Sequence, residues 1–211
     1  MKVNEIFNSI EGEGIRAGKP CTFIRLFGCN LNCSYCDTRY SCEGFDYRLM
    51  DVNEIMEAVD AYGCPNITVT GGEPLLHDGI DGLLETLASN GYEVNVETNG
   101  TIVPRIRNGV FYTVDFKTFS SGMSEHMNID AFTTLEKTDV VKFVVGSIED
   151  LEQALRFVLK NEIEANIFVS PIFGKIELVT IAEFLLSHKL NDWRMQIQLH
   201  KYIWSPERRG V

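Results

Sequence analysis

Short apolar runs alternate with amphipathic stretches along most of the chain. The apolar runs are rich in Val, Ile and Phe and predict strands, whereas hydrophobic residues spaced three or four apart predict helices with one buried face. The expected strands cover residues 20–28, 66–70, 92–96, 110–116, 140–145 and 165–169, with a last extended run at 194–199. The expected helices cover about 52–62, 80–88, 148–159 and 178–188. Strand followed by helix, repeated some six times, predicts a parallel sheet covered by helices.

Two of the expected helices have recognisable starts. Asp51 and Glu54 have the spacing of a capping box, and Ser147 with Asp150 predicts a second cap. The chain of 211 residues has room for one domain with a sizeable core, residues 1–211. Six strand–helix units are too few for a closed eight-stranded barrel. We therefore expect an α/β fold, a single-domain open partial barrel of the (β/α)6 type.

Polar residues and glycines follow the expected strands where each one ends. Three cysteines follow the first strand, residues 71–74 (Gly-Gly-Glu-Pro) follow the second, and residues 97–100 (Glu-Thr-Asn-Gly) follow the third. Residues 115–117 and 170–171 occupy the same position after two later strands. Because parallel strands place their carboxyl ends at one edge of the sheet, these segments should meet there and form the functional site.

The three cysteines, Cys29, Cys33 and Cys36, lie within eight residues. In one loop they can face a single compact body such as an iron–sulfur cluster. A [4Fe-4S] cluster normally takes four thiolates, so three would leave one iron open to a small molecule. A structural zinc site would need a fourth ligand, usually from a second pair, and no such pair follows at a matching distance. Cys33 and Cys36 could instead form a redox pair, which leaves Cys29 without a role.

The remaining cysteines, Cys21, Cys42 and Cys64, are scattered, and we assign them no role because free cysteine is commonly a small buried hydrophobe. A net charge of −11 argues against a nucleic-acid binder, which needs a basic surface. The chain shows neither an apolar run long enough for a membrane span nor a signal peptide at its start. We expect a cytoplasmic protein whose cysteines remain thiols.

Two further features suggest binding. Residues 3–14 begin apolar and end with Glu11 and Glu13, which Gly12 separates, an arrangement equally typical of a surface turn. Arg25 lies inside an apolar strand, and a buried arginine needs a partner, so we expect it to point at a carboxylate or at the end of the sheet.

The CxxxCxxC loop directly after a strand, together with the Gly-Gly-Glu-Pro turn after the next strand, resembles the radical S-adenosylmethionine (SAM) superfamily. This resemblance implies a [4Fe-4S] cluster on Cys29, Cys33 and Cys36, whose open iron is chelated by SAM. It also implies that one electron from the reduced cluster cleaves SAM to methionine and a 5'-deoxyadenosyl radical, and that backbone groups of the glycine turn bind the SAM amino group.

The flanking motifs closely resemble the 7-carboxy-7-deazaguanine synthase family of that superfamily. The matching stretches are 7–14, 23–33, 36–38, 97–100 and 199–201. The resemblance implies conversion of 6-carboxy-5,6,7,8-tetrahydropterin into 7-carboxy-7-deazaguanine with loss of ammonia, in queuosine and 7-deazapurine biosynthesis. It further implies a homodimer, Mg²⁺ dependence, catalytic use of SAM, and a reducing electron donor such as flavodoxin or ferredoxin. The adenosyl radical would abstract hydrogen from C6 of the pterin, and after the ring contracts the product radical would take that hydrogen back from 5'-deoxyadenosine.

The same resemblance assigns site residues. Those implied for substrate are Ile10, Glu11, Gly12, Arg25, Thr70, Glu97, His200 and Val211. Those implied for SAM are Tyr35, Cys36, Asp37, Gly72, Asp115, Phe116, Lys117, Ser170, Pro171, Ile172 and Phe173. Thr38 is implied as the Mg²⁺ ligand, which suits a hard oxygen donor. Glu11, Glu13 and Lys117 are candidates for proton handling. The chain departs from the family at Phe119, where proline is common.

The residues make chemical sense of this assignment. A pterin presents a ring N–H beside an exocyclic amine, and one carboxylate can accept both. Arg25 could meet the substrate carboxylate with its planar guanidinium. Two alternatives remain. A radical SAM activase would make a glycyl radical on a partner protein, and a non-catalytic electron-transfer or sensor module would need a fourth cluster ligand and no SAM-binding turn.

Overall fold

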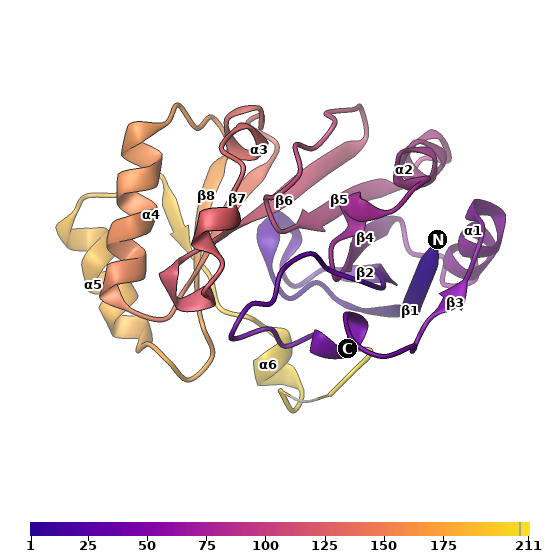
Figure 1. Ribbon diagram of the computed structural model, residues 1–211, viewed down its shortest axis with the longest axis horizontal. Coiled ribbons are helices and arrows are strands. Elements are labelled where there is room, and N and C mark those ends of the chain that lie inside the picture. Colours follow the sequence, from indigo (N-terminus) through magenta and orange to yellow (C-terminus); the bar gives the residue numbers. More distant parts are fainter. Residues whose placement is uncertain (207) are drawn as a thin grey trace.

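The computed structural model describes residues 1–206 and 208–211. Within these residues the strands form one nine-stranded sheet in the order β3–β1–β2–β4–β5–β6–β7–β8–β9 (Figure 1). The strands are β1 (Lys2–Ile10), β2 (Pro20–Leu26), β3 (Arg48–Leu49), β4 (Asn66–Gly71), β5 (Glu93–Thr98), β6 (Val110–Lys117), β7 (Val140–Val145), β8 (Asn166–Pro171) and β9 (Trp193–Met195). The α-helices are α1 (Val52–Asp60), α2 (Ile80–Ser89), α3 (Asp130–Thr133), α4 (Ile148–Lys160), α5 (Leu178–Ser187) and α6 (His200–Ile203).

The sheet is open and mostly parallel, which confirms the expected fold class. Strands β2 and β4 to β9 pair in parallel, each with its neighbour in that order. Strand β1 pairs antiparallel with both β2 and β3 at one edge. The edge strands β3 and β9 do not pair with each other, so the barrel stays incomplete.

The sequence pattern missed β1, because its apolar residues do not alternate regularly. Val3 and Phe7 are both buried but belong to different apolar clusters, because the register shifts between Val3 and Glu5. Such an irregularity at the edge of a sheet breaks the two-residue period on which strand prediction depends. The extended run expected at 194–199 was also wrong in extent, since β9 ends at Met195 and the short helix α6 follows soon after.

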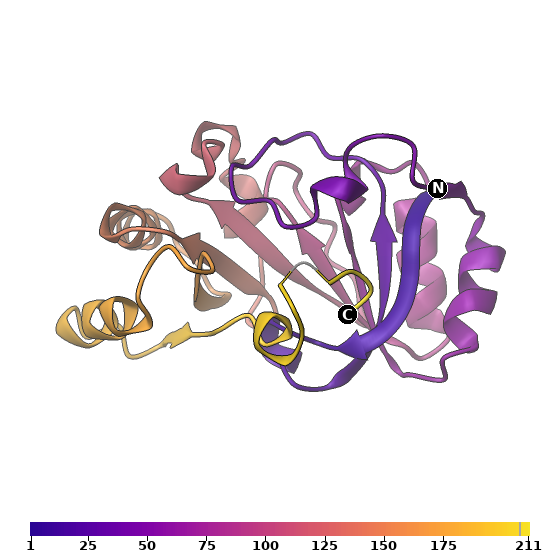
Figure 2. The ribbon, with the colours of Figure 1, turned by 90° about the horizontal axis from the view of Figure 1, so that it is seen from below.

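The two faces of the sheet differ in chemistry. Residues such as Val69, Val96 and Phe143 are fully buried on the face that the helices cover. Alternate residues face the other way, and many of them are polar, Thr70 and Glu97 among them. Figure 2 shows helices outside the curved sheet and the C-terminal segment crossing its inner face. The inner face of the partial barrel is therefore free to carry a polar site.

Both expected helix caps are confirmed. The Asp51 side chain accepts a hydrogen bond from the Glu54 amide at 3.0 Å, and the Glu54 carboxylate accepts one from the Asp51 amide at 2.8 Å. The Ser147 hydroxyl oxygen accepts from the Asp150 amide at 3.3 Å. Each cap satisfies helix N–H groups that have no partner within the helix. No helix among residues 1–206 and 208–211 is both long and apolar enough to cross a membrane.

We predict that Leu87→Ala lowers the free energy of unfolding by about 2–5 kcal/mol, because Leu87 is fully buried between α2 and the sheet and its truncation leaves a cavity. The matched control is Leu186→Ala at an exposed position of α5, where a change within about 0.5 kcal/mol is expected. Denaturant unfolding measures both. Equal losses in the two variants would contradict the assigned core.

Candidate active site

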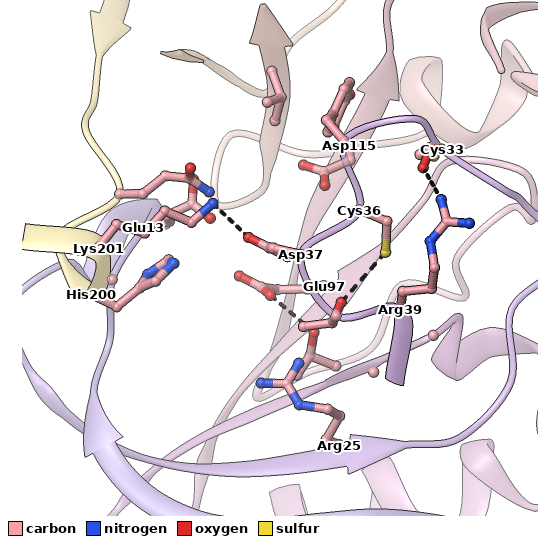
Figure 3. Close-up of a pocket in the computed structure, with 18 of the residues that line it drawn as sticks. Glu13, Arg25, Cys33, Cys36, Asp37, Arg39, Glu97, Asp115, His200 and Lys201 are labelled. Carbon is pink, nitrogen blue, oxygen red and sulfur yellow. Dashed lines mark hydrogen bonds and ion pairs between the residues drawn. The ribbon is translucent and has the colours of Figure 1, made fainter. Parts of the chain in front are cut away.

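A cavity of about 630 Å³ opens at the inner face, between the cysteine loop, the ends of the central strands and the C-terminal segment (Figure 3). This size suits a small-molecule ligand. The sequence-predicted residues that line it are Ile10, Glu11, Gly12, Glu13, Arg25, Cys29, Cys33, Tyr35, Cys36, Asp37, Thr38, Thr70, Gly72, Glu97, Asp115, Lys117, Ile172, Phe173, His200 and Val211. Segments distant in sequence thus meet at the expected edge of the sheet.

Three predicted residues do not line this cavity. Phe116 lies between Asp115 and Lys117 in β6, so strand alternation turns its ring to the opposite face, where it packs on Phe132 with ring centroids 5.4 Å apart. Ser170 and Pro171 are buried at the end of β8. The Ser170 hydroxyl has no hydrogen-bond partner among the described residues.

The cysteine loop presents Cys29, Cys33 and Cys36 to one cavity. Hydrogen bonding to the Cys42 thiol lowers the pKa of Cys29 and of Cys36 to about 6 in each case. Burial raises the pKa of Cys33. A thiol with a pKa near 6 is largely thiolate at neutral pH, the form that ligates metals. Cys42, to which we assigned no role from the sequence, also lines the cavity, after the short turn that follows Thr38.

The donor set fits a cluster better than a single ion. In the described part of the chain, no group of three or more His, Cys, Asp or Glu side chains is arranged to hold one metal ion. One zinc ion would draw its sulfur ligands within about 4 Å of each other, since each Zn–S bond is about 2.3 Å. A cubane cluster spaces its thiolates more widely, so three thiols lining one cavity can be bridged by it.

The glycine turn packs directly against the strand that leads into the cysteine loop. A Cβ at Gly71 would overlap the Leu26 carbonyl, and a Cβ at Gly72 would overlap that of Gly28. The Gly72 amide donates to the Leu26 carbonyl at 3.0 Å, and the Glu73 amide to the Gly28 carbonyl at 2.8 Å. The turn therefore requires glycine for close backbone approach, whatever ligand it also binds.

Glu73 connects the glycine turn to the next motif. Its carboxylate is fully buried and accepts hydrogen bonds from the Thr98 hydroxyl, the Asn99 amide and the Leu75 amide at 2.7, 2.7 and 3.0 Å. Burial raises its pKa to about 7, although these donors oppose the rise. The sequence showed both motifs but not that Glu73 joins them, because that contact depends on neighbouring strands.

A charged cluster lies on the inner wall of the cavity. Lys142 Nζ lies 3.1 Å from Asp115 Oδ1 and 3.3 Å from Glu13 Oε2, and Lys117 Nζ lies 2.9 Å from Asp115 Oδ2. Burial opposes ionisation of Asp115, but the two lysines outweigh it and lower the pKa of that carboxyl. Lys142 was not among the residues predicted from the sequence, although a lysine in the middle of the apolar strand β7 is a signal for a buried, paired charge.

Glu11 forms a second buried acidic site. Its Oε2 accepts a hydrogen bond from the Thr68 hydroxyl at 2.5 Å and lies 3.7 Å from Arg16 Nη2. Burial and the charge of Glu97 raise the pKa of Glu11 to about 7, while Thr68 and Arg16 limit the rise. Glu13 Oε1 is also buried and has no hydrogen-bond partner among the described residues. The cavity thus offers acceptor oxygens that a ligand N–H could satisfy.

Arg25 meets a carboxylate, as the sequence predicted, and the partner is Glu5 of β1. Arg25 Nε donates to Glu5 Oε1 at 2.8 Å, and the Tyr40 hydroxyl donates to the same oxygen at 2.9 Å. On the neighbouring strands, the Thr70 hydroxyl donates to Glu97 Oε2 at 3.0 Å.

The C-terminal segment closes one side of the cavity. The Leu199 amide donates to the Gly12 carbonyl at 3.1 Å, and the His200 ring occupies the space that a side chain at Gly12 would fill. Lys201 Nζ forms a 2.7 Å ion pair with Asp37 Oδ2 of the cysteine loop (Figure 3). Desolvation opposes ionisation of Asp37, but Lys201 outweighs it and lowers the pKa of this carboxyl, whose side chain is still 42% exposed. Helix α6 consequently joins the two sides of the site.

Comparison with known proteins identifies the family. The model of the radical SAM superfamily matches residues 23–185. A 7-carboxy-7-deazaguanine synthase from Clostridium acetobutylicum is 44% identical over 218 aligned residues, which cover 100% of this chain and 99% of that protein. The chain belongs to the 7-carboxy-7-deazaguanine synthase family of the radical SAM superfamily. It is therefore an enzyme, and membership in the superfamily implies a [4Fe-4S] cluster and SAM.

Other relatives and solved structures agree with this assignment. A 7-carboxy-7-deazaguanine synthase from Chlorobaculum tepidum is 42% identical, covering 100% of this chain and 97% of that protein. The crystal structure of QueE from Escherichia coli has a TM-score of 0.75 at 24% identity and covers 93% of each chain. SuiB from Streptococcus suis has a TM-score of 0.60 at 14% identity, covering 82% of this chain and 48% of that one. These two structures support the fold.

We predict that Gly72→Ala weakens SAM binding at least tenfold and destabilises the apoprotein by about 1–3 kcal/mol, because the new Cβ must displace the Gly28 carbonyl beside the cysteine loop. Gly82→Ala is the control, since nothing lies within 4 Å of its Cβ position in α2 and alanine favours helix. Calorimetric SAM titration and denaturant unfolding measure the effects. Wild-type SAM affinity in Gly72→Ala would show that this close approach is unimportant.

Proposed function

We propose that the chain converts 6-carboxy-5,6,7,8-tetrahydropterin into 7-carboxy-7-deazaguanine with loss of ammonia, in 7-deazapurine biosynthesis. The observation that carries the proposal is the full-length similarity to proteins named 7-carboxy-7-deazaguanine synthase. The acidic cavity supports it, because a pterin presents adjacent N–H donors that carboxylates can accept. A homodimer, catalytic use of SAM, and an electron donor such as flavodoxin or ferredoxin belong to the same proposal.

In this proposal Cys29, Cys33 and Cys36 hold the cluster. When bound, the cluster and SAM supply a carbon radical by one-electron reductive cleavage. The residues proposed to contact SAM line the cavity, except Phe116, whose ring is turned away, and Ser170 and Pro171, which are buried at the end of β8. Thr38 also lines the cavity, and its hydroxyl would be a ligand of Mg²⁺, which prefers oxygen donors.

The substrate side is formed by residues 10–12, Arg25, Thr70 and Glu97, with His200 and Val211 from the C-terminal segment. Glu5 and Tyr40 fix the orientation of Arg25, whose guanidinium can then meet a substrate carboxylate. Lys142 holds Glu13 beside Asp115, so Glu13 presents its free Oε1 from a fixed position. Protein groups thereby orient the ring and exclude water around a reactive radical.

Glu11 is the group that we assign to proton transfer. A carboxyl group with a pKa of about 7 is present in both protonation states at neutral pH, which favours general acid–base catalysis. The departing amine needs a proton to leave as ammonia, and Glu11 can donate it. Glu13 and Lys117 remain further candidates, each fixed by the ion pairs around Asp115.

The activase alternative is less well supported. It requires a groove open to a protein segment, whereas α6 and the Lys201–Asp37 ion pair close this cavity on one side. The electron-transfer alternative requires a fourth cluster ligand. Cys42 lies near the cluster cysteines, but the glycine turn and the acidic cavity have no role in that alternative.

The test is anaerobic incubation of the reconstituted, reduced protein with SAM and 6-carboxy-5,6,7,8-tetrahydropterin. We expect a deazaguanine chromophore and ammonia in equal amounts, with 5'-deoxyadenosine accumulating far less than product. Cys29→Ala should abolish both products. SAM cleavage without any deazaguanine would contradict the proposed substrate, and 5'-deoxyadenosine formed one-for-one with product would contradict catalytic use of SAM.

We predict that product formation falls as the pH rises through about 7, because Glu11 must be protonated to act as an acid and its pKa is raised to that value. Glu11→Gln should lower turnover at least a hundredfold and abolish the fall in product formation above about pH 7, the basic limb of the pH profile. The conservative variant Glu11→Asp keeps a titratable group and should retain a pH-dependent limb. An unchanged limb in Glu11→Gln would show that another group is responsible.

A further inference from the structure

A small hydrogen-bond network of Asn30, Asn99 and Thr101 joins the cysteine loop to the segment after β5. Asn99 Nδ2 donates to Asn30 Oδ1 at 2.9 Å, and Asn30 Nδ2 donates to the Thr101 hydroxyl at 2.9 Å. The Thr101 hydroxyl donates in turn to Asn99 Oδ1 at 2.7 Å, which closes a ring of three side chains. The second proton of the Asn99 amide faces Cys29 Sγ, with nitrogen and sulfur 3.7 Å apart.

The orientation of the Asn99 amide is determined by its neighbours. Its Oδ1 accepts from both the backbone amide and the hydroxyl of Thr101, at 3.1 and 2.7 Å. An inverted amide would place its NH₂ group against the Thr101 N–H donor, so this orientation is excluded. The NH₂ group must therefore face Asn30 and Cys29. Asn30 Oδ1 accepts one of its two protons, so the other has an acceptor only if Cys29 Sγ accepts it.

The backbone of Asn99 is fixed as firmly as its side chain. Its amide donates to the fully buried carboxylate of Glu73, which also accepts from Thr98. The backbone amide of Glu73 donates a hydrogen bond to the carbonyl of Gly28, the residue before Cys29. Glu73 thus links the backbones of Asn99 and Cys29, so the Asn99 amide is held close to Cys29 Sγ.

From this geometry we propose that Asn99 is a positioning residue that donates a hydrogen bond to the cluster thiolate of Cys29 and raises the reduction potential of the cluster. The proposal rests on the cluster assignment made above. Reduction adds negative charge to the cluster and its sulfur ligands, and a donor to one thiolate stabilises that charge. Cys29 also accepts from the Leu31 amide at 3.4 Å and is hydrogen-bonded to the Cys42 thiol, so Asn99 adds a further donor to this sulfur.

The test measures the midpoint potential of the reconstituted full-length protein by reductive titration followed by electron paramagnetic resonance. Asn99→Ala removes the donor and should shift the potential to a more negative value. Thr101→Val removes the partner that orients the amide and should shift it in the same direction by a smaller amount. Asn108→Ala, on the exposed loop before β6, should leave the potential unchanged.

Iron content identifies which assumption fails. If Asn99→Ala holds four irons per chain and keeps the wild-type potential, the inference is wrong. If Asn99→Ala does not load iron, Thr101→Val decides, and an unshifted potential there overturns the inference. Cys29→Ala tests the underlying assignment separately: full cluster loading in that variant would show that the cluster lies elsewhere and would overturn the proposed function as well.

Discussion

The site depends on the close approach of two strand ends, which is possible because Gly71 and Gly72 have no side chains. The backbone after β4 lies directly against the end of β2, where a Cβ on either glycine would overlap a carbonyl group. This contact fixes the start of the cysteine loop, and Glu73 extends it to β5 through Thr98 and Asn99. Three neighbouring strand ends are thereby held as one frame, and ligands can bind in a preorganised arrangement.

The inner face of the sheet is polar at an energetic cost. Removing Lys142, Asp115 and Glu13 from water is unfavourable, and their mutual attraction offsets that cost only in part. Such a cluster is weak evidence for stability and stronger evidence for a site that needs fixed charges. The apolar packing that supports it lies on the other face, where helices cover residues such as Val96 and Phe143. Stability and chemistry are thus separated between the two faces of one sheet.

Local pattern was sufficient to predict most of this arrangement. The parallel strands, the helices with their caps and the motifs at the strand ends all have short-range signals. The individual site residues came mostly from the resemblance to the family, and most of them line one cavity. The sequence pattern did not predict β1, whose bulge breaks the alternation, or the short helix α6. It predicted a carboxylate for Arg25 but did not identify Glu5 as the partner, and it missed the ion pair of Lys201 with Asp37. No periodicity encodes which residue of one segment meets which residue of another.

The central claim is that three thiolates leave one iron of the cluster open to SAM. Mössbauer spectroscopy tests it directly, on an oxidised cluster enriched in the Mössbauer-active iron isotope, in the absence and presence of SAM. The account predicts that SAM changes the signal of about one quarter of the iron, since one of the four irons lacks a thiolate. An identical spectrum with and without SAM, at saturating SAM and full iron loading, would contradict it.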